Sequence, residues 1–294
     1  MWRRWAGPPT RNPKKNPVIA TAAQLFVDPE FSIKPAYHEA IAGWDVSIET
    51  GAIIQENLDE WARINTANLI QQSGITVTPE TKLVLQNAIT FAAKWQEDFR
   101  QWDVIDYDFT RADGTITRVK MMCSVRHAPY MVSDGWRGVR LDYADGELAA
   151  FVLIPDDDIE QVTPTMLRQA VSQLCRPNET IGFVLTRLPR FTVAISKDLA
   201  DLFTAIGVEH GMDRAMTTDL PMIPTQAKQQ AIIVVDEQGT VVSTVTIVCM
   251  GMDIPHWAEE PIDIMADQPF YFIVGDVETG TPLFLSHIGD PKMA

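Results

Sequence analysis

Apolar runs of strand length alternate along the chain with clusters of Gly, Asp and other turn-forming residues, and this pattern predicts mostly β-structure. Residues 18–27 are rich in Ala, Val, Ile and Phe and are expected to form a buried strand. Residues 81–95 form a longer apolar run, whose β-branched and aromatic content predicts a central strand buried on both faces. Further strands are expected at 108–125, as a hairpin around Asp113-Gly114, and at 130–143, 147–155, 183–195, 231–235, 240–248, 270–274 and 283–287.

Helical periodicity is confined to fewer segments. The strongest is 54–72, where Leu58 and Trp61 follow the three-four spacing of an amphipathic face and Ser73-Gly74 would end the helix. Shorter helices are expected at 34–43, 164–174 and 198–206. Many strands with interspersed helices, without repeats or a linker, predict one α+β domain over 18–294. The basic, proline-containing residues 1–17 are expected to be a disordered lead-in.

Composition excludes several classes of partner and cofactor. The net charge of −15 argues against a nucleic-acid partner, because phosphate binding favours a basic surface. No stretch reaches the roughly 18 uninterrupted apolar residues of a membrane helix, so we expect no membrane partner. The three cysteines include no C-x-x-C pair and their number is odd, which fits neither a disulfide scaffold nor a zinc site. No metal or cofactor is therefore expected.

The sequence contains none of the common catalytic motifs, such as G-x-S-x-G, S-x-x-K, H-E-x-x-H or a glycine-rich phosphate loop. Cys123 and His127 are four residues apart in an expected strand, a spacing that puts them on one face without making them adjacent. The run 156–158 of three aspartates is interpreted as a solvated turn. Asn178-Glu179-Thr180 matches a glycosylation acceptor, which matters only in a secretory pathway. We therefore expect that the protein is not an enzyme.

Several segments between about 18 and 291 resemble, in the same order, segments of the serpin family. Residues 85–95 are similar to the family's signature strand of the large sheet, and residues 61–70 to the helix motif that precedes it. The other similar segments are Leu153-Ile154-Pro155-Asp156, Leu188-Pro189-Arg190-Phe191, the helix segment 198–208, and the C-terminal hairpin formed from 266–270 and 279–285. Each motif is weak alone, but the ordered set is specific.

The resemblance implies a large central β-sheet with further smaller sheets and surrounding helices. It also implies an inhibitor rather than an enzyme. Serpins bait a protease with an exposed loop, hold it as an acyl-enzyme after cleavage, and insert the freed loop into the large sheet as an extra strand. The expected partner is a target protease of the serine class, with the cysteine class as an alternative. We expect a monomer that can polymerise by loop–sheet insertion, and an extracellular location, although the N-terminus does not read as a signal peptide.

The resemblance places the reactive loop at about 239–260, and its hinge must be able to enter a sheet. Glu237, Gly239 and Thr240 stand where the family pattern has an acid, a glycine and a threonine. Val242 and Thr244 stand where alanines are usual, but both are uncharged and have high strand propensity, so insertion is permitted. Strand alternation predicts that Thr240, Val242, Thr244 and Thr246 share the inward face, where the three threonine hydroxyls would need partners.

The reactive bond follows from counting along the loop. With Glu237 as the first residue, the seventeenth is Asp253, and the predicted bond is Asp253-Ile254. Met252-Asp253 is the alternative; Ile254-Pro255 also stays open, although a proline directly after the cut would hinder attack. An Asp bait would suit an acid-preferring protease, and a Met bait would suit an elastase-like or subtilisin-like enzyme.

The resemblance also assigns Asn87, Trp95 and Gln229 to the region where the large sheet opens. Gln229 replaces a histidine that bonds to the signature-strand asparagine in typical members, and a glutamine can still donate to Asn87. The chain begins later than a typical member, so the N-terminal helices are expected to be missing. This departure keeps an alternative open: a non-inhibitory or truncated serpin-like protein that acts as a binding module or is a remnant.

Overall fold

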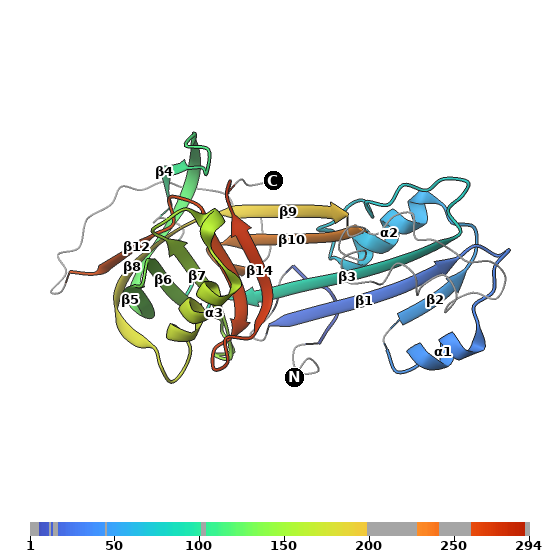
Figure 1. The fold of residues 1–294 in the computed structure, drawn as a ribbon, viewed down its shortest axis with the longest axis horizontal. Helices are drawn as coiled ribbons and strands as arrows, with labels where there is room; N and C mark the ends of the chain where they lie inside the picture. The colour runs from blue at the N-terminus through green and yellow to red at the C-terminus, as the bar shows by residue number, and fades with distance from the viewer. Residues whose placement is uncertain are drawn as a thin grey trace. The chain divides into compact units, whose positions relative to one another are not determined.

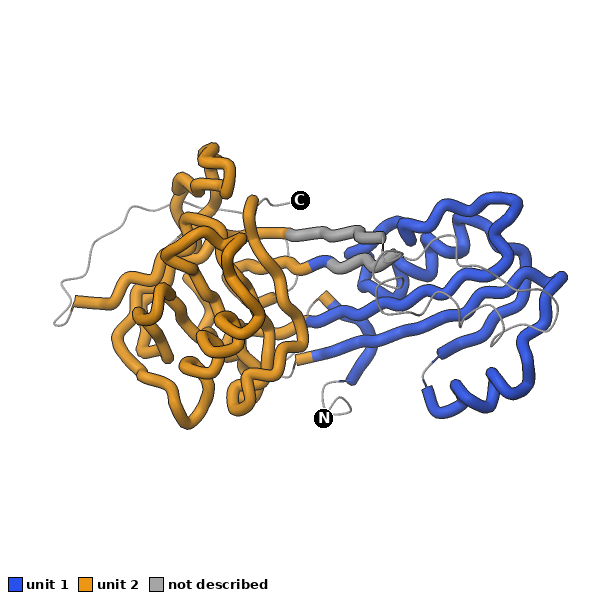
Figure 2. The backbone as a smooth tube through the Cα atoms, viewed as in Figure 1, with its two compact units in different colours: residues 1–10, 18–91, 194–232 blue, residues 11–17, 92–193, 233–294 orange. Residues whose placement is uncertain are grey.

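The computed structural model describes residues 6–11, 13, 17–44, 46–100, 104–198, 228–240 and 260–291. The chain divides into two compact units (Figure 2). Unit 1 comprises residues 1–10, 18–91 and 194–232, and unit 2 comprises residues 11–17, 92–193 and 233–294.

The described strands belong to two sheets (Figure 1). The six-stranded sheet has the order β2 (Val46–Thr50), β1 (Val18–Val27), β3 (Leu83–Lys94), β11 (Gly239–Thr240), β10 (Lys228–Asp236), β9 (Phe191–Asp198). The eight-stranded sheet has the order β12 (Ile262–Met265), β8 (Thr180–Pro189), β5 (Ile116–Ser133), β6 (Trp136–Asp142), β7 (Leu148–Pro155), β13 (Phe270–Asp276), β14 (Pro282–Ile288), and β4 (Val104–Thr110) also pairs with β5. The described helices are α1 (Pro35–Ile41), α2 (Gln55–Asn65), α3 (Pro164–Gln173) and the 3-10 turn Ile159–Gln161.

In unit 1, α2 covers one face of β1 and β3. Leu58 of α2 is fully buried and packs with Phe26 of β1 and Val84 of β3. On β1, Leu25 and Val27 form a separate cluster with partly buried apolar side chains around α1 and β2. Alternate residues of one strand therefore contribute to two apolar clusters, as expected when successive side chains point to opposite faces.

In unit 2, α3 packs against the eight-stranded sheet. Thr163 caps this helix by accepting a hydrogen bond from the Met166 backbone N–H at 3.3 Å, and Pro164 occupies the first turn, where its missing N–H costs nothing. Leu167 of α3 and Leu174, the residue after the helix, are buried in one cluster with Ala170, Val171, Phe151, Leu153 and Ile273. Every residue of β7 is buried, so this strand has a near-continuous apolar sequence.

The structure confirms the expected α+β fold and most expected elements, but the 54–72 helix is shorter than expected. Helix α2 ends at Asn65, and Ala67 and Asn68 adopt left-handed backbone conformations with φ of 51° and 60°. The Thr66 hydroxyl donates to the Ala62 carbonyl at 2.7 Å and accepts from the Ile70 N–H at 3.0 Å. These local side-chain bonds compete with a further helical turn, which apolar spacing alone does not reveal.

The expectation that the 81–95 strand is buried on both faces is wrong for its first half. Leu85 is 56% exposed and Ile89 is 44% exposed, whereas the residue directly before each of them, Val84 and Ala88, is buried. This half therefore alternates like a strand that is covered on one face. From Phe91 to Ala93 every residue is buried, as predicted.

Two other expected strands are interrupted by turns. The segment 130–143 reverses at Asp134 and Gly135, both with positive φ, between β5 and β6. The segment 183–195 is divided at Arg190 between β8 and β9. The helix expected at 198–206 lies almost entirely outside the described residues, with Asp198 ending β9. No helix of the described chain is long and apolar enough to cross a membrane.

Candidate hinge site

The candidate site is a short strand in unit 2, where the chain leaves β10, turns and enters the six-stranded sheet again. Gly239 and Thr240 form β11, which is antiparallel to both of its neighbours. Thr240 stands opposite Val235 of β10 and Ala93 of β3. The first two residues after the turn are thus already hydrogen-bonded into the sheet as a strand.

Gly239 is required by the closeness of β3. A Cβ atom at this position would collide with the Ala93 carbonyl oxygen and would lie 2.9 Å from the Lys94 Cα atom. Both neighbours are backbone atoms, which cannot move aside without breaking the pairing of β11 with β3. The glycine of the family pattern therefore has a steric cause in this chain.

Thr240 is 3% exposed, and its hydroxyl has a buried partner, as the inward orientation requires. The Tyr143 hydroxyl lies 2.7 Å from the Thr240 hydroxyl. Tyr143 is fully buried, and this burial raises the pKa of its hydroxyl far above the ordinary value, so the group stays neutral. A neutral hydroxyl can either donate to Thr240 or accept from it.

Trp95 joins the hinge turn to the end of β3. Its indole N–H donates to the Asp236 carbonyl at 2.9 Å, and its backbone N–H donates to the Gln238 carbonyl at 3.0 Å. Its ring stacks on Tyr143 with centroids 4.8 Å apart and meets Phe99 edge-on at 6.2 Å. Trp95 is 3% exposed, so the structure brings this predicted residue into direct contact with the hinge turn.

Two adjacent carboxylates, of Asp236 and Glu237, hold the turn in place. The Asp236 side chain accepts from the backbone N–H groups of Gln238 and Gly239, at 2.8 and 3.2 Å. Glu237 is buried and forms an ion pair with the Arg190 guanidinium, and its carbonyl accepts from the Phe99 N–H at 2.9 Å. The acid at 237 is therefore paired and hydrogen-bonded rather than simply solvated.

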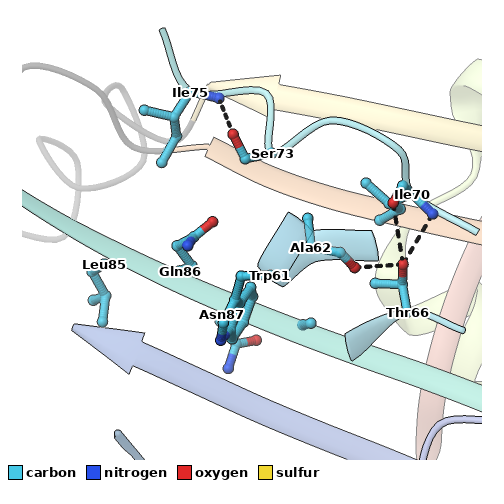
Figure 3. Close-up of a pocket in the computed structure, with 10 residues that line it drawn as sticks. Trp61, Ala62, Thr66, Ile70, Ser73, Ile75, Leu85, Gln86 and Asn87 are labelled. Atoms are coloured by element: carbon cyan, nitrogen blue, oxygen red, sulfur yellow. Dashed lines mark hydrogen bonds between the residues drawn. The ribbon is translucent and has the colours of Figure 1, made fainter. Parts of the chain in front are cut away.

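Asn87 lies in unit 1, on the exposed alternation of β3. It lines a small cavity of about 30 Å³ between α2 and β3, together with Trp61, Thr66 and Gln86 (Figure 3). Gln86 is buried on the opposite alternation and donates to the Gln24 side-chain oxygen of β1 at 3.1 Å. The cavity is large enough for a water molecule and has polar walls.

Most of the other predicted site residues lie outside the described residues, namely Val242, Thr244, Met252, Asp253 and Ile254. Gln229 belongs to the backbone of β10, and its bond to Asn87 stays a prediction.

Three residues of the hinge contacts were missed by the sequence reasoning: Tyr143, Asp236 and Arg190. Asp236 directly precedes the predicted acid, and an Asp before a glycine-containing turn was the available signal for it. Tyr143 and Arg190 come from segments that are distant in sequence, so their contacts with Thr240 and Glu237 are seen only in the folded structure. Among the described residues, no cluster of His, Cys, Asp and Glu side chains could hold a metal ion.

Comparison with known proteins assigns the family. The family model described as Serpin (serine protease inhibitor) matches residues 7–291, and this chain therefore belongs to the serpin family. Its fold is the serpin fold, with mixed sheets and few helices. Members of the family are generally protease inhibitors rather than catalytic enzymes, although many are non-inhibitory.

The relatives are distant. Serpin-Z4 of Arabidopsis thaliana is 25% identical, over 94% of this chain and 77% of its own length. An uncharacterized serpin-like protein of Thermococcus kodakarensis is 26% identical, over 96% of this chain and 69% of its own. Among solved structures, a thyroxine-binding globulin complex with thyroxine has a TM-score of 0.79 at 18% identity, covering 96% of this chain and 78% of the globulin. Uncleaved ovalbumin has a TM-score of 0.76 at 19% identity, covering 95% of this chain and 79% of its own.

Proposed function

We propose that this protein inhibits serine-type endopeptidases by a suicide mechanism. A protease cleaves the loop at about 239–260, remains attached as an acyl-enzyme, and is trapped when the freed loop inserts between β3 and β10. The observation that carries the proposal is β11, because Gly239 and Thr240 already pair with both of these strands. Insertion would then extend an existing strand and would not need to nucleate a new one.

The hinge contacts support an inserted strand of defined register. Continuing the pairing of β11 with β10 would bring Val242 opposite Ile233, and Thr244 would follow on the same alternation. Thr240, the first residue of this alternation, is buried, and its hydroxyl bonds to Tyr143. Uncharged residues at 242 and 244 fit such an environment, because a charge there would be desolvated without a partner.

The proposed reactive bond is Asp253-Ile254, with Met252-Asp253 as the alternative. The proposed partner is a serine protease, with the cysteine class as an alternative, and the proposed location is extracellular. The proposed state is a monomer, and the same insertion made into another copy of the chain would give loop–sheet polymers.

The first experiment mixes the full chain with a panel of serine and cysteine proteases and looks for an SDS-stable adduct by gel and intact mass. We expect an adduct with at least one protease, and mass analysis of the released C-terminal fragment gives the bond that is cut. Cleavage near Asp253 by every protease without any adduct would contradict inhibition. It would favour the alternative of a non-inhibitory binding module.

A hinge variant tests the mechanism separately from the choice of protease. Thr240→Arg puts a charge at a buried position and should convert the inhibitor into a substrate, so that cleavage continues while the adduct is lost. Thr110→Arg, at an exposed position of β4, is the matched control and should keep the adduct. Equal adduct formation by both variants would contradict the proposal that the loop inserts at Thr240.

A further inference from the structure

A surface hollow in unit 2 lies beside the Asn178-Glu179-Thr180 triplet. The hollow has a volume of about 360 Å³ and is formed by the end of β5, the end of α3 and the turn that leads into β8. Its lining residues are Tyr130, Met131, Val132, Ser133, Ser172, Gln173, Asn178 and Thr180, all uncharged. This volume is within the range of about 300–1,000 Å³ that is usual for small-molecule pockets.

Asn178 heads the only Asn-x-Ser/Thr triplet in the whole sequence. Asn178 and Thr180 are exposed, and within the described part of the chain neither side chain has a hydrogen-bond partner. The middle residue, Glu179, faces inward: its side chain is 12% exposed, and one of its oxygens lies 3.7 Å from the Arg140 guanidinium. This contact holds the turn to the protein, while Asn178 and Thr180 stay on the surface.

Tyr130 provides an aromatic wall next to the triplet. It stands opposite Thr180 in the pairing of β5 with β8. Its ring lies against Gly182, where an added Cβ would come within 2.6 Å of the ring. The glycine thus makes room for the ring to lie close to the sheet surface. One aromatic ring combined with uncharged hydroxyl and amide groups suits a neutral ligand that carries both apolar faces and hydroxyls, which describes a sugar.

The remaining polar groups of the hollow are held in place by one another. The Ser133 hydroxyl donates to the Gln173 side-chain oxygen at 3.1 Å, and the Gln173 amide donates to Asp134 at 3.1 Å. The Ser172 hydroxyl donates to the Gln169 carbonyl at 2.7 Å. These groups keep acceptor capacity toward the hollow, because a hydroxyl oxygen that donates one hydrogen bond can still accept another.

We propose that Asn178 is a site of N-linked glycosylation, and that the hollow seats the first sugar of the attached glycan against Tyr130. In the reaction, Asn178 Nδ2 attacks the anomeric carbon of a lipid-linked diphosphate oligosaccharide and releases one proton to solvent. The bond from that carbon to the diphosphate oxygen breaks, and the lipid diphosphate leaves with the electron pair. The inference rests on the proposed extracellular location but is independent of protease inhibition.

The test of the modification expresses the full chain behind a secretion leader in a eukaryotic host and measures the intact mass before and after an amidase that releases N-glycans. We expect a glycan on the secreted wild type and on Thr180→Ser, and none on Asn178→Gln or Thr180→Ala. Secreted wild-type chain that carries no amidase-sensitive mass would overturn the assignment of Asn178.

The test of the seating compares the melting temperature of each glycosylated protein with that of its amidase-treated form. The glycan should raise the midpoint of the wild type by about 2 °C, because a sugar that binds only the folded state stabilises it. Tyr130→Ala should keep the glycan but lose this difference. Tyr107→Ala, at a half-buried tyrosine of β4, is the control and should keep it. A glycan-dependent shift that is the same in Tyr130→Ala and in the wild type would overturn the seating.

Discussion

The two halves of β3 come from one apolar run but have different surroundings. In unit 1, residues 84–90 alternate between buried and exposed, so that Val84 is covered by α2 while Leu85 is 56% exposed. In unit 2, Ala92, Ala93 and Trp95 are all nearly inaccessible. What differs is the set of neighbours, since the second half pairs with β11 and has Tyr143 stacked on Trp95.

This difference predicts which substitutions in β3 destabilise the protein most. The first half is paired with β1, packed on one face by α2, and joined to β1 by the buried Gln86–Gln24 amide pair. The second half adds an aromatic stack, a buried indole hydrogen bond and pairing with β11. We therefore expect substitutions in the second half to have the larger effects, and both halves can be tested by paired variants.

The largest effect is expected for Trp95→Ala. This variant removes the ring stack on Tyr143, the edge contact with Phe99 and the hydrogen bond to Asp236, and leaves a cavity. It should lower the free energy of unfolding by about 3–5 kcal/mol, measured by urea denaturation. Trp44→Ala, at a tryptophan that is 72% exposed, is the control and should change it by less than about 0.5 kcal/mol. Equal losses of unfolding free energy in Trp95→Ala and Trp44→Ala would show that the contacts of Trp95 do not stabilise the protein.

The next effect concerns the first half of β3 and compares two adjacent residues. Val84→Ala should cost about 2 kcal/mol of unfolding free energy, because Val84 is buried against Leu58 and Phe26. Leu85→Ala should cost less than about 0.5 kcal/mol, although it removes a larger side chain, because Leu85 is mostly exposed. Denaturation curves of the two variants measure the difference, and a larger loss for Leu85→Ala would show that both faces of this half are covered.

A smaller effect is expected for Tyr143→Phe, which keeps the ring stack but removes the hydroxyl bonded to Thr240. The loss of unfolding free energy should be about 1–2 kcal/mol, because the Thr240 hydroxyl is left buried without this partner. The double variant Tyr143→Phe with Thr240→Val should recover part of the loss. If the double variant is as unstable as the sum of the two single variants, the hydroxyl pair is not coupled.

The smallest effect is the pH dependence of the same contact. Burial raises the pKa of the Tyr143 hydroxyl in the folded state above its value of about 10 in the unfolded chain. The unfolded state therefore loses this proton first, so the stabilisation is complete below pH 10 and declines as the pH rises above it. Wild type should lose stability between pH 9 and pH 11 more steeply than Tyr143→Phe. Parallel pH profiles would indicate that Tyr143 ionises as readily in the folded protein as in the unfolded chain.

The sequence was enough to predict the features that depend on local pattern. The strand at 83–94, the hairpin at Asp113-Gly114 and the inward position of Thr240 follow from alternation and turn chemistry. The end of α2 did not follow, because the Thr66 hydroxyl bonds compete with the helix and apolar spacing does not record them.

The contacts of the hinge were less predictable than its residues. Gly239 and Thr240 were identified from the family pattern, but the reason for the glycine is the Ala93 carbonyl on another strand. Tyr143 and Arg190 approach the hinge from segments far away in sequence, and a single sequence gives no information on such pairings. The exposed alternation of Leu85 and Ile89 was also missed, because burial depends on what covers a strand.

The turn at Asp236 gives the proposed reactive loop a fixed starting point. Its carboxylate already satisfies the two backbone N–H groups that follow it, and the carbonyls of Asp236 and Gln238 are held by Trp95. The described contacts of this turn are therefore made by residues up to Thr240 and by Trp95. If the proposed reactive loop follows Thr240, a library of sequences placed further along it would start from the same anchored turn, so target preference could be varied without changing these contacts.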